Sequence, residues 1–302
     1  MQPTRSLERL KHSPLTVALS GAVITSFSAI IFELSDADAL TATVLRMVYA
    51  LPVLFVGWLY LRRKDERTRR DRLMALVAGA LLAADVVAWQ SAIGYIGTGL
   101  ATLIANSQVI IVPLTVWAVL GERPVRRVIY AMPVVVVGLA LITGLGGEDT
   151  FGERPVWGVV LASGAAVLYS GFLILFRRSN RSLGPTVGPL MDVVAGAAVV
   201  AALIGVASGN LDLDLPAESH AWLLALALGP QVVGWLLIGY AMPRLPSASS
   251  SFVILLQPTL TLIWGRILFD EIASAVQYAG VALVLAGIAY GTARWRQSSS
   301  EA

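Results

Sequence analysis

The sequence predicts an all-α integral membrane protein, with ten transmembrane helices arranged as two inverted five-helix repeats. Three observations lead to this fold class. Of the 302 residues, 57% are hydrophobic and only 14% are charged, and the mean hydropathy is +0.75, whereas soluble domains carry about 25% charged residues. The apolar residues gather into ten runs, and the basic residues gather in alternate connections between those runs.

Each transmembrane helix is predicted from an apolar run of about 20 residues, the length that crosses a bilayer core. The runs are residues 15–32, 39–61, 73–93, 98–120, 129–145, 156–176, 187–207, 221–242, 248–269 and 276–295. They divide the chain into a cytoplasmic N-terminal tail (1–14), a first repeat (15–145), an outer linker (146–155), a second repeat (156–295) and a cytoplasmic C-terminal tail (296–302). The connections are short, so we expect no soluble domain.

The basic residues predict the orientation in the membrane. If the N-terminus is cytoplasmic, all 22 Lys and Arg residues except Arg46, Arg154 and Arg266 lie in cytoplasmic segments, as the positive-inside rule requires. Removing one helix would invert every later connection, so this pattern supports the count of ten. It also explains the pI of about 9.4 without a nucleic-acid partner, because the positive charge faces the inner surface of the lipid bilayer.

An internal repeat supports the division into halves. A shift of 149 residues places Gln108 on Gln257 and Gly138 on Gly287, and a shift of 146 residues places the segment 85–89 on the segment 231–235. Because each half contains an odd number of spans, the second copy must insert upside down. Inverted repeats of this kind place a binding site near the bilayer midplane, between the halves.

With these features the chain resembles the drug/metabolite transporter superfamily, EamA type, over about residues 15–293. The residues that carry the resemblance are Arg46, the span containing Trp89 and Gly121-Glu122 in the first repeat, and Pro246 to Ser251, Gln257-Pro258 and Asp270-Glu271 in the second. The resemblance implies export of amino acids or other small metabolites across a bacterial inner membrane, with both termini cytoplasmic. The sequence departs from the family pattern at Val109, where proline is usual, and at Asp85, where other residues are common.

Asp85 is the most informative polar residue at membrane depth. Burying an ionisable group there costs about 2.5–3.5 kcal/mol on insertion scales, so such residues usually serve a function. Asp85 shares a helix face with Trp89, four residues later, and the second repeat has Gln231 and Trp235 at the same spacing. We predict that these side chains form a substrate cavity, in which Asp or Gln orients a polar group against an indole wall. Hydrogen bonding between helices and core packing are the alternatives.

Three further polar residues join the predicted site. Gln108 and Gln257 occupy equivalent places in the two repeats, and Gln257 precedes Pro258, which interrupts helical hydrogen bonding. Arg46 is predicted to bind a substrate carboxylate, with gating or snorkelling to the interface as alternatives. Asp85 and Asp192 are candidates for proton coupling, and for Asp192 the alternative is pairing with a nearby helix.

The composition argues against other kinds of site. The chain has no cysteine, and His12 and His220 both lie outside the apolar runs, so we expect no metal site, no cofactor and no enzymatic nucleophile–base pair. Gly287 and Gly291 form a small-residue ridge. We expect it to pack inside a monomer, with a homodimer face as the alternative.

We therefore expect a secondary transporter that moves a small-molecule substrate by alternating access, with amino-acid export as the leading activity. An exporter of organic cations or drug-like amphiphiles is the first alternative, since Asp85 and the two Trp residues would suit a cation. A channel-like facilitator is a second alternative, but the apolar runs carry few charged residues that could form rings along a pore.

Overall fold

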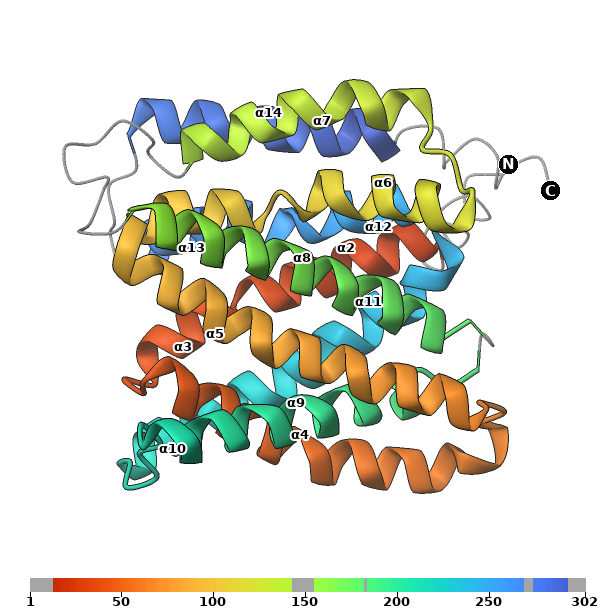
Figure 1. Ribbon diagram of the computed structural model, residues 1–302, viewed down its shortest axis with the longest axis vertical. Coiled ribbons are helices and arrows are strands. Elements are labelled where there is room, and N and C mark those ends of the chain that lie inside the picture. Colours follow the sequence, from red (N-terminus) through yellow and green to blue (C-terminus); the bar gives the residue numbers. More distant parts are fainter. Residues whose placement is uncertain (1–12, 143–154, 182–183, 269–273, 293–302) are drawn as a thin grey trace, which may run out of the picture.

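The computed structural model describes residues 13–142, 155–181, 184–268 and 274–292, and every regular element in those ranges is helical. The long helices lie roughly side by side in a stack (Figure 1). The elements are α2 (Pro14–Ser26), α3 (Ser28–Leu34), α4 (Ala39–Leu61), η1 (Arg62–Lys64), α5 (Arg69–Ala105), α6 (Gln108–Leu120), α7 (Arg126–Ile142), α8 (Pro155–Ser179), α9 (Val187–Ser208), α10 (Ala217–Leu226), η2 (Ala227–Gly234), α11 (Trp235–Ala241), η3 (Met242–Arg244), α12 (Ser247–Ile254), α13 (Leu256–Leu268) and α14 (Ala275–Thr292).

The predicted fold class is confirmed. Within the described ranges, eight helical segments are long and apolar enough to cross a membrane, and Ala275–Gly291 is a shorter apolar helix. The helix α7 occupies the remaining predicted run. Asp270-Glu271, residues 146–154 of the predicted linker, and the two tails apart from residues 13 and 14 lie outside the described residues.

The boundary between the third and fourth spans differs from the prediction. We expected a break at residues 94–97, but helical geometry continues through this stretch to Ala105. Figure 1 shows that α5 turns back on itself here. The stretch contains two glycines and no proline, so the chain can bend without losing its helical hydrogen bonds. The interruption falls instead at Asn106 and Ser107, next to Gln108.

The two halves of the chain pack into each other. The first-half helix α5 packs against α8 and α9, α4 against α9 and η2, α2 against η2, α11 and α13, and α7 against α14. Two glycines allow one of these crossings. A Cβ atom on Gly79 would collide with the carbonyl oxygen of Val193, and one on Gly196 would collide with the carbonyl oxygen of Leu76. The backbones of α5 and α9 therefore touch directly, a contact that small residues permit in membrane proteins.

The predicted glycine ridge faces the other half of the chain. A Cβ atom on Gly138 of α7 would meet Gly280 and Val284 of α14, and one on Gly287 of α14 would meet Val135 of α7. The later residue of α7, Gly138, meets an earlier part of α14 than Val135 does, so α7 and α14 are antiparallel. Gly287 thus packs inside the chain.

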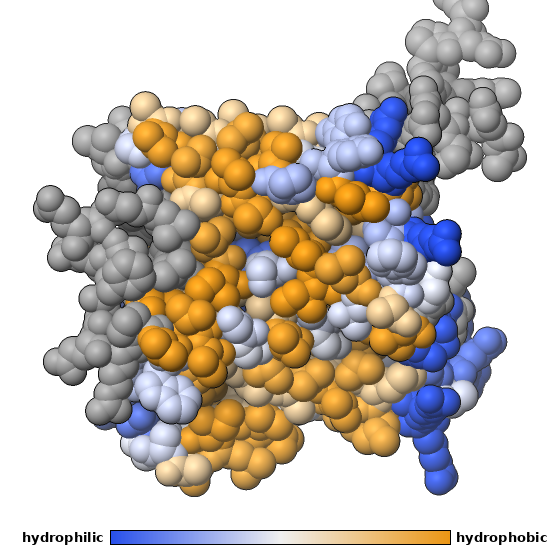
Figure 2. Space-filling view, turned by 45° about the horizontal axis from the view of Figure 1, so that its top comes forward, coloured by the Kyte–Doolittle hydropathy of each residue, from blue (hydrophilic) through white to orange (hydrophobic). Residues whose placement is uncertain are grey.

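The two ends of the molecule differ in charge. The "basic end" carries the arginines of residues 62–72, 123–127 and 177–181, and the "acidic end" carries Asp36, Asp38, Asp212 and Asp214. Figure 2 shows hydrophilic side chains gathered along one end and a broad hydrophobic surface between the ends. Exposed Val199, Leu203 and Val206 on α9 belong to this apolar surface. It is the surface expected of a protein surrounded by lipid.

Candidate functional site

Four spans are irregular near their middle. Phe27 separates α2 from α3, residues 106–107 separate α5 from α6, and Leu255 separates α12 from α13. In the eighth span η2 is a π-helix that contains Pro230, whose ring supplies no backbone N–H. Irregular backbone is tolerated at membrane depth where it is buried in protein or lines a cavity. These four interruptions therefore point to the centre of the molecule as the candidate site.

A central cavity of about 180 Å³ is lined from beside three of these interruptions, those at Phe27, η2 and Leu255. The first half of the chain contributes Arg46 from α4 and Asp85 from α5, and the second half contributes Gln231 from η2, Trp235 from α11 and Gln257 from α13. These side chains are far apart in the sequence and come together only because the halves interlock. Five of the sequence-predicted site residues thus share one cavity.

The polar groups of the central cavity are poorly paired by the protein itself. Arg46 and Asp85 interact electrostatically, but the ion pairs among the described residues do not include one between them. Arg46 Nε, Gln231 Nε2 and Gln257 Nε2 are buried and have no hydrogen-bond partner. A buried donor without a partner costs about 1–3 kcal/mol. The cavity therefore offers several unused donors and a carboxylate to a polar ligand.

Trp235 forms an apolar part of the wall of the central cavity, and an aromatic cluster packs behind it. Trp235 is 9% exposed and meets the rings of Phe172 and Phe176 edge to face, with centroid separations of 5.1 and 6.1 Å. Edge-to-face contacts hold aromatic rings in fixed orientations. Trp235 is thus a rigid apolar surface beside the polar groups. Its counterpart Trp89 does not line the cavity and packs against the cluster of Ala92, Ile96, Ala101 and Ala162.

Two other predicted residues lie outside the central cavity. Gln108 is 1% exposed, and both polar atoms of its amide are buried without a partner. Asp192 accepts a hydrogen bond of 2.7 Å from Arg67, on the connection between η1 and α5 at the basic end. Of the two interpretations of Asp192, the structure thus displays the pairing, with a loop arginine as the partner.

Sequence reasoning missed Thr25, Ser28 and Tyr169, which also line the central cavity. Thr25 and Ser28 flank the interruption at Phe27, and the Thr25 hydroxyl donates to the carbonyl oxygen of Gly21 at 3.0 Å. The sequence signal for Thr25 and Ser28 was weak, because single hydroxyl residues are common in membrane helices and can hydrogen-bond to the backbone of their own helix. Tyr169 lies in the middle of a long apolar helix, where its hydroxyl group could have marked it as a candidate site residue.

A cluster of buried charges joins the two halves at the basic end. In this "clasp", made of Asp65, Arg67 and Asp192, the Arg67 guanidinium donates to Asp65 at 2.8 and 2.9 Å and to Asp192 at 2.7 Å. The side chains of Arg67 and Asp65 are only 2% and 4% exposed. Trp58 Nε1 also donates to Asp65, at 3.0 Å.

The ionised state of Asp65 is strongly favoured. Burial alone would raise the pKa of this carboxyl group, but the hydrogen bonds from Arg67 and Trp58 and the charge of Arg67 outweigh burial and lower the pKa from 3.8 to about 2. Burial likewise works to lower the pKa of Arg67, but Asp65 and Asp192 reverse this and raise it. Asp65 and Arg67 are therefore a charged pair over the whole physiological pH range.

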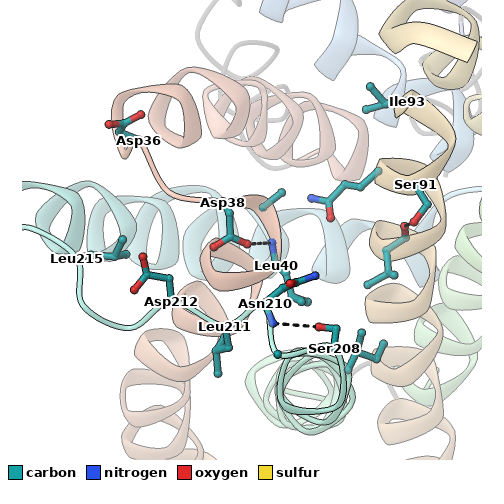
Figure 3. Close-up of a pocket in the computed structure, with 15 residues that line it drawn as sticks. Asp36, Asp38, Leu40, Ser91, Ile93, Ser208, Asn210, Leu211, Asp212 and Leu215 are labelled. Carbon is teal, nitrogen blue, oxygen red and sulfur yellow. Dashed lines mark hydrogen bonds between the residues drawn. The ribbon is translucent and has the colours of Figure 1, made fainter. Parts of the chain in front are cut away.

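A wide cavity of about 1,060 Å³ opens at the acidic end. Figure 3 shows Asp36, Asp38 and Asp212 around it, and Asp38 accepts hydrogen bonds from the backbone N–H groups of Leu40 and Thr41 at the start of α4. Val87 and Gln90 of α5 line this cavity, whereas Asp85 and Val86 line the central one. The two cavities are therefore adjacent along α5.

At the acidic end the equivalent contact between the halves is a neutral hydrogen bond, and further neutral hydrogen bonds between the halves join Tyr49 to His220 at 2.7 Å and Trp264 to Ser26 at 2.8 Å. The backbone N–H of Asp212 donates to Thr41 Oγ1 at 3.0 Å. This "acidic-end contact" of Thr41 and Asp212 links the connection before α10 to α4, as the clasp links the connection before α5 to α9. The two contacts thus occupy equivalent places in the inverted halves.

Comparison with known proteins agrees with this architecture. The EamA-like transporter family matches the chain twice, over residues 13–144 and 156–291. An uncharacterised transporter of Archaeoglobus fulgidus is 24% identical, over 95% of this chain and 98% of the relative. The pseudopaline exporter CntI of Pseudomonas aeruginosa is 25% identical, over 92% of this chain and 95% of the relative. A solved crystal structure with 17% identity superposes with a TM-score of 0.77, covering 94% of this chain and 98% of the other.

The chain belongs to the EamA-like transporter family, and the match extends across both halves. It is a multi-pass membrane transporter of the drug/metabolite transporter superfamily. The solved structure at 17% identity agrees with this assignment at the level of the fold.

Proposed function

We propose, from membership of the EamA-like transporter family, that this protein exports a small metabolite bearing both a carboxylate and an ammonium group, with amino acids as the leading class. The central cavity is the observation that carries the proposal. Its Arg46 and Asp85 present opposite charges that are not joined in an ion pair. A zwitterion supplies a partner for each charge, and Arg is well suited to grip a carboxylate.

The size of the central cavity favours a small substrate. Its volume of about 180 Å³ is below the roughly 300–1,000 Å³ of pockets that hold drug-sized ligands. An exporter of organic cations is the alternative, supported by Trp235 beside Asp85. A cation leaves Arg46 without a counter-charge and adds a second positive group to the same cavity. An amino acid therefore fits the charges better.

The distribution of charge and one relative support the direction of transport. By the positive-inside rule, the basic end faces the cytoplasm of a bacterial inner membrane and the acidic end faces outward. The relative from Pseudomonas aeruginosa is named as an exporter. In our proposal the halves rock about the central cavity, so that the substrate loads from the basic end and leaves through the wide cavity at the acidic end.

We assign proton coupling, as part of the same proposal, to Asp85. It is an acidic residue of the central cavity, where substrate and proton compete for one carboxylate. Asp192 is a weaker candidate because Arg67 already holds it in the clasp. Replacing Asp85 with Asn then abolishes transport driven by a pH gradient, while exchange of substrate for substrate persists in part. Asp85→Asn transport at the wild-type rate under a proton gradient would exclude this role.

A transport assay in proteoliposomes tests the proposed function. The purified chain is assayed for counterflow with a panel of radiolabelled amino acids and quaternary ammonium cations, beside the variants Asp85→Asn, Arg46→Gln and Gln257→Ala. We expect saturable counterflow of at least one amino acid, partial loss of counterflow in Asp85→Asn and loss of most counterflow in Arg46→Gln. Arg63→Gln is the matched control, because it removes one positive charge from an exposed position at the basic end.

The outcomes of this assay separate the candidates. Counterflow of cations alone, retained in Arg46→Gln, would overturn the amino-acid proposal in favour of a cation exporter. Flux that rises linearly with concentration and shows no counterflow would indicate a channel-like facilitator. Wild-type counterflow in both charge variants would show that the central cavity is not the site.

A further inference from the structure

A second polar cavity, of about 300 Å³, lies at the basic end between α6, α8 and the start of α12. Its lining has one glutamate, Glu122, against three arginines, Arg177, Arg178 and Arg181. The remaining lining is largely apolar, with Val112 and Val116 from α6 and Leu173 and Ile174 from α8. The "basic-end cavity" thus combines an excess of positive charge with an apolar wall.

Arg177 has hydrogen-bonding capacity that the protein does not use. Its Nη2 atom lies 3.6 Å from Glu122 Oε1, beyond the usual length of a charge-assisted hydrogen bond. The same Glu122 oxygen accepts a hydrogen bond from the backbone N–H of Ser247 at 3.3 Å. Arg177 Nη1 is buried and has no partner. The guanidinium therefore has a donor left for an anion, the ligand that its planar fork matches best.

Two helices lead from the basic-end cavity toward the central one. On α8, Tyr169 of the central cavity is followed at four-residue intervals by Leu173 and Arg177 of the basic-end cavity, a distance of about 12 Å along the helix. On α6, Val112 of the basic-end cavity is preceded one turn earlier by Gln108, whose buried amide has no partner. An unpaired amide therefore lies one helical turn from the basic-end cavity, on the α6 face that lines it.

We infer that the basic-end cavity is a loading site, which binds the carboxylate of the substrate at Arg177 before the substrate passes Gln108 to the central cavity. This inference rests on the proposed function for its direction and its substrate class. The apolar wall takes the side chain of the substrate, and Arg178 and Arg181 add positive charge at the entrance. The same chemistry would suit the phosphate of a lipid headgroup, so the test must separate the two sources.

Binding is measured first, on the full chain in nanodiscs of phosphatidylcholine, with radiolabelled phenylacetate as a probe that has a carboxylate and a small apolar body. We expect saturable binding that weakens about tenfold in Arg177→Gln and recovers in part in Arg177→Lys, which keeps the charge but not the fork. Arg63→Gln, at an exposed position of the basic end, should bind as wild type does. Equal binding by Arg177→Gln and wild type, or equal losses in Arg177→Gln and Arg63→Gln, would overturn the site.

The binding assay is repeated in nanodiscs of phosphatidylglycerol to identify the source of the anion. If phenylacetate still binds at Arg177, a soluble carboxylate occupies the cavity and the loading role stands. If the anionic lipid abolishes the binding, the cavity is a lipid-headgroup site and the loading role is overturned. Retained elution of each variant as a monodisperse peak shows that a lost signal is not a loss of folding.

Transport from each face then tests the loading role itself. In proteoliposomes, Arg177→Gln should raise KM about tenfold for an amino acid presented at the basic-end face and leave KM unchanged at the acidic-end face. Unchanged KM at both faces, with normal counterflow, would overturn the loading site and leave the proposed function intact. Saturable, Arg177-dependent binding of phenylacetate in a chain that shows no amino-acid counterflow would instead overturn the proposed function.

Discussion

The contacts that join the two halves differ greatly between the ends of the molecule. At the basic end, the clasp of Asp65, Arg67 and Asp192 buries charged groups in hydrogen bonds of 2.7 to 2.9 Å. At the acidic end, Thr41 and the backbone of Asp212 make one hydrogen bond of 3.0 Å beside a cavity of about 1,060 Å³. The two contacts thus occupy equivalent places in the inverted repeat but differ in strength.

This inequality indicates which end opens more easily. Opening the basic end separates the buried charges of Arg67 and Asp192, while Asp65 stays paired with Arg67 on the same connection. Breaking the acidic-end contact costs about one ordinary neutral hydrogen bond. The repeat makes both movements geometrically available, and the contacts bias their populations. We therefore expect the resting protein to be closed at the basic end and open at the acidic end.

The largest expected effect comes from Arg67→Gln, which removes the shared cation of the clasp. Asp192 then loses its guanidinium partner, and Asp65 keeps only the longer contact of 3.5 Å with the partly exposed Arg72. Removal of one partner from a buried pair costs about 3–5 kcal/mol. We expect a large fall in melting temperature in detergent. Arg63→Gln removes an exposed cation nearby and should melt as wild type does. Equal melting temperatures for Arg67→Gln and wild type would contradict the claim that the clasp is stronger than the acidic-end contact.

A smaller loss is expected from Gly188→Ala, which disturbs the clasp without removing any charge. A Cβ atom at this position would collide with Arg67 Nη2 and lie 2.9 Å from Asp65 Oδ2, so the Arg67–Asp65 pair must shift. Such overpacking costs about 1–3 kcal/mol. Gly164→Ala, also on a membrane-spanning helix but with open space around its Cβ position, is the matched control. A melting temperature for Gly188→Ala as high as that of the control would show that the clasp tolerates displacement.

At the acidic end, Thr41→Val should cost only about 1 kcal/mol, because it removes one hydrogen bond and keeps the shape of the side chain. The comparison also predicts that the two variants change the open fraction in opposite directions. Loss of the acidic-end contact should increase the fraction of molecules open at that end, whereas loss of the clasp should decrease it. Spin-label distances across each end measure these populations. A shift of the same sign in both variants would contradict the proposed bias.

The smallest effect concerns pH. The pKa of Asp65 is lowered to about 2 in the folded protein, so its stabilising contribution is fully present above the unfolded value near 3.8 and is lost only as the pH falls toward 2. The difference in melting temperature between wild type and Asp65→Asn should therefore stay constant from about pH 8 to 5 and shrink below about pH 4. A difference that shrinks between pH 7 and 5 would show that Asp65 is not held in the ionised state.

Most of the fold and half of the candidate site could be predicted from sequence, because both depend on the cost of placing polar groups in lipid. That cost confines charges to the ends of spans and makes Asp85 and Arg46 conspicuous. In contrast, the direction in which a side chain points depends on how the helices rotate against each other. Trp89 therefore faces a different cluster from Trp235.

The clasp and the helix boundary illustrate what sequence patterns could not predict. Arg67 lies in a tract of basic residues and looks like any topology determinant, yet its side chain is 2% exposed because Asp192 from the other half reaches it. Residues 94–97 were expected to connect two spans, but they keep helical geometry. The pairing of Arg67 depends on a contact between segments distant in sequence, for which the internal repeat was the one available guide.

Accessibility of one cysteine tests the central claim most directly, and the chain has no native cysteine to interfere. Val86→Cys places a thiol in the central cavity, and a membrane-impermeant maleimide is applied from each face in turn. We predict labelling from the acidic-end face, slowed by a transported amino acid, and new labelling from the basic-end face when Arg67→Gln is added. Val199→Cys, on the apolar surface, is the unlabelled control. Labelling from neither face, or equally from both without Arg67→Gln, would contradict a central cavity that opens to one end at a time.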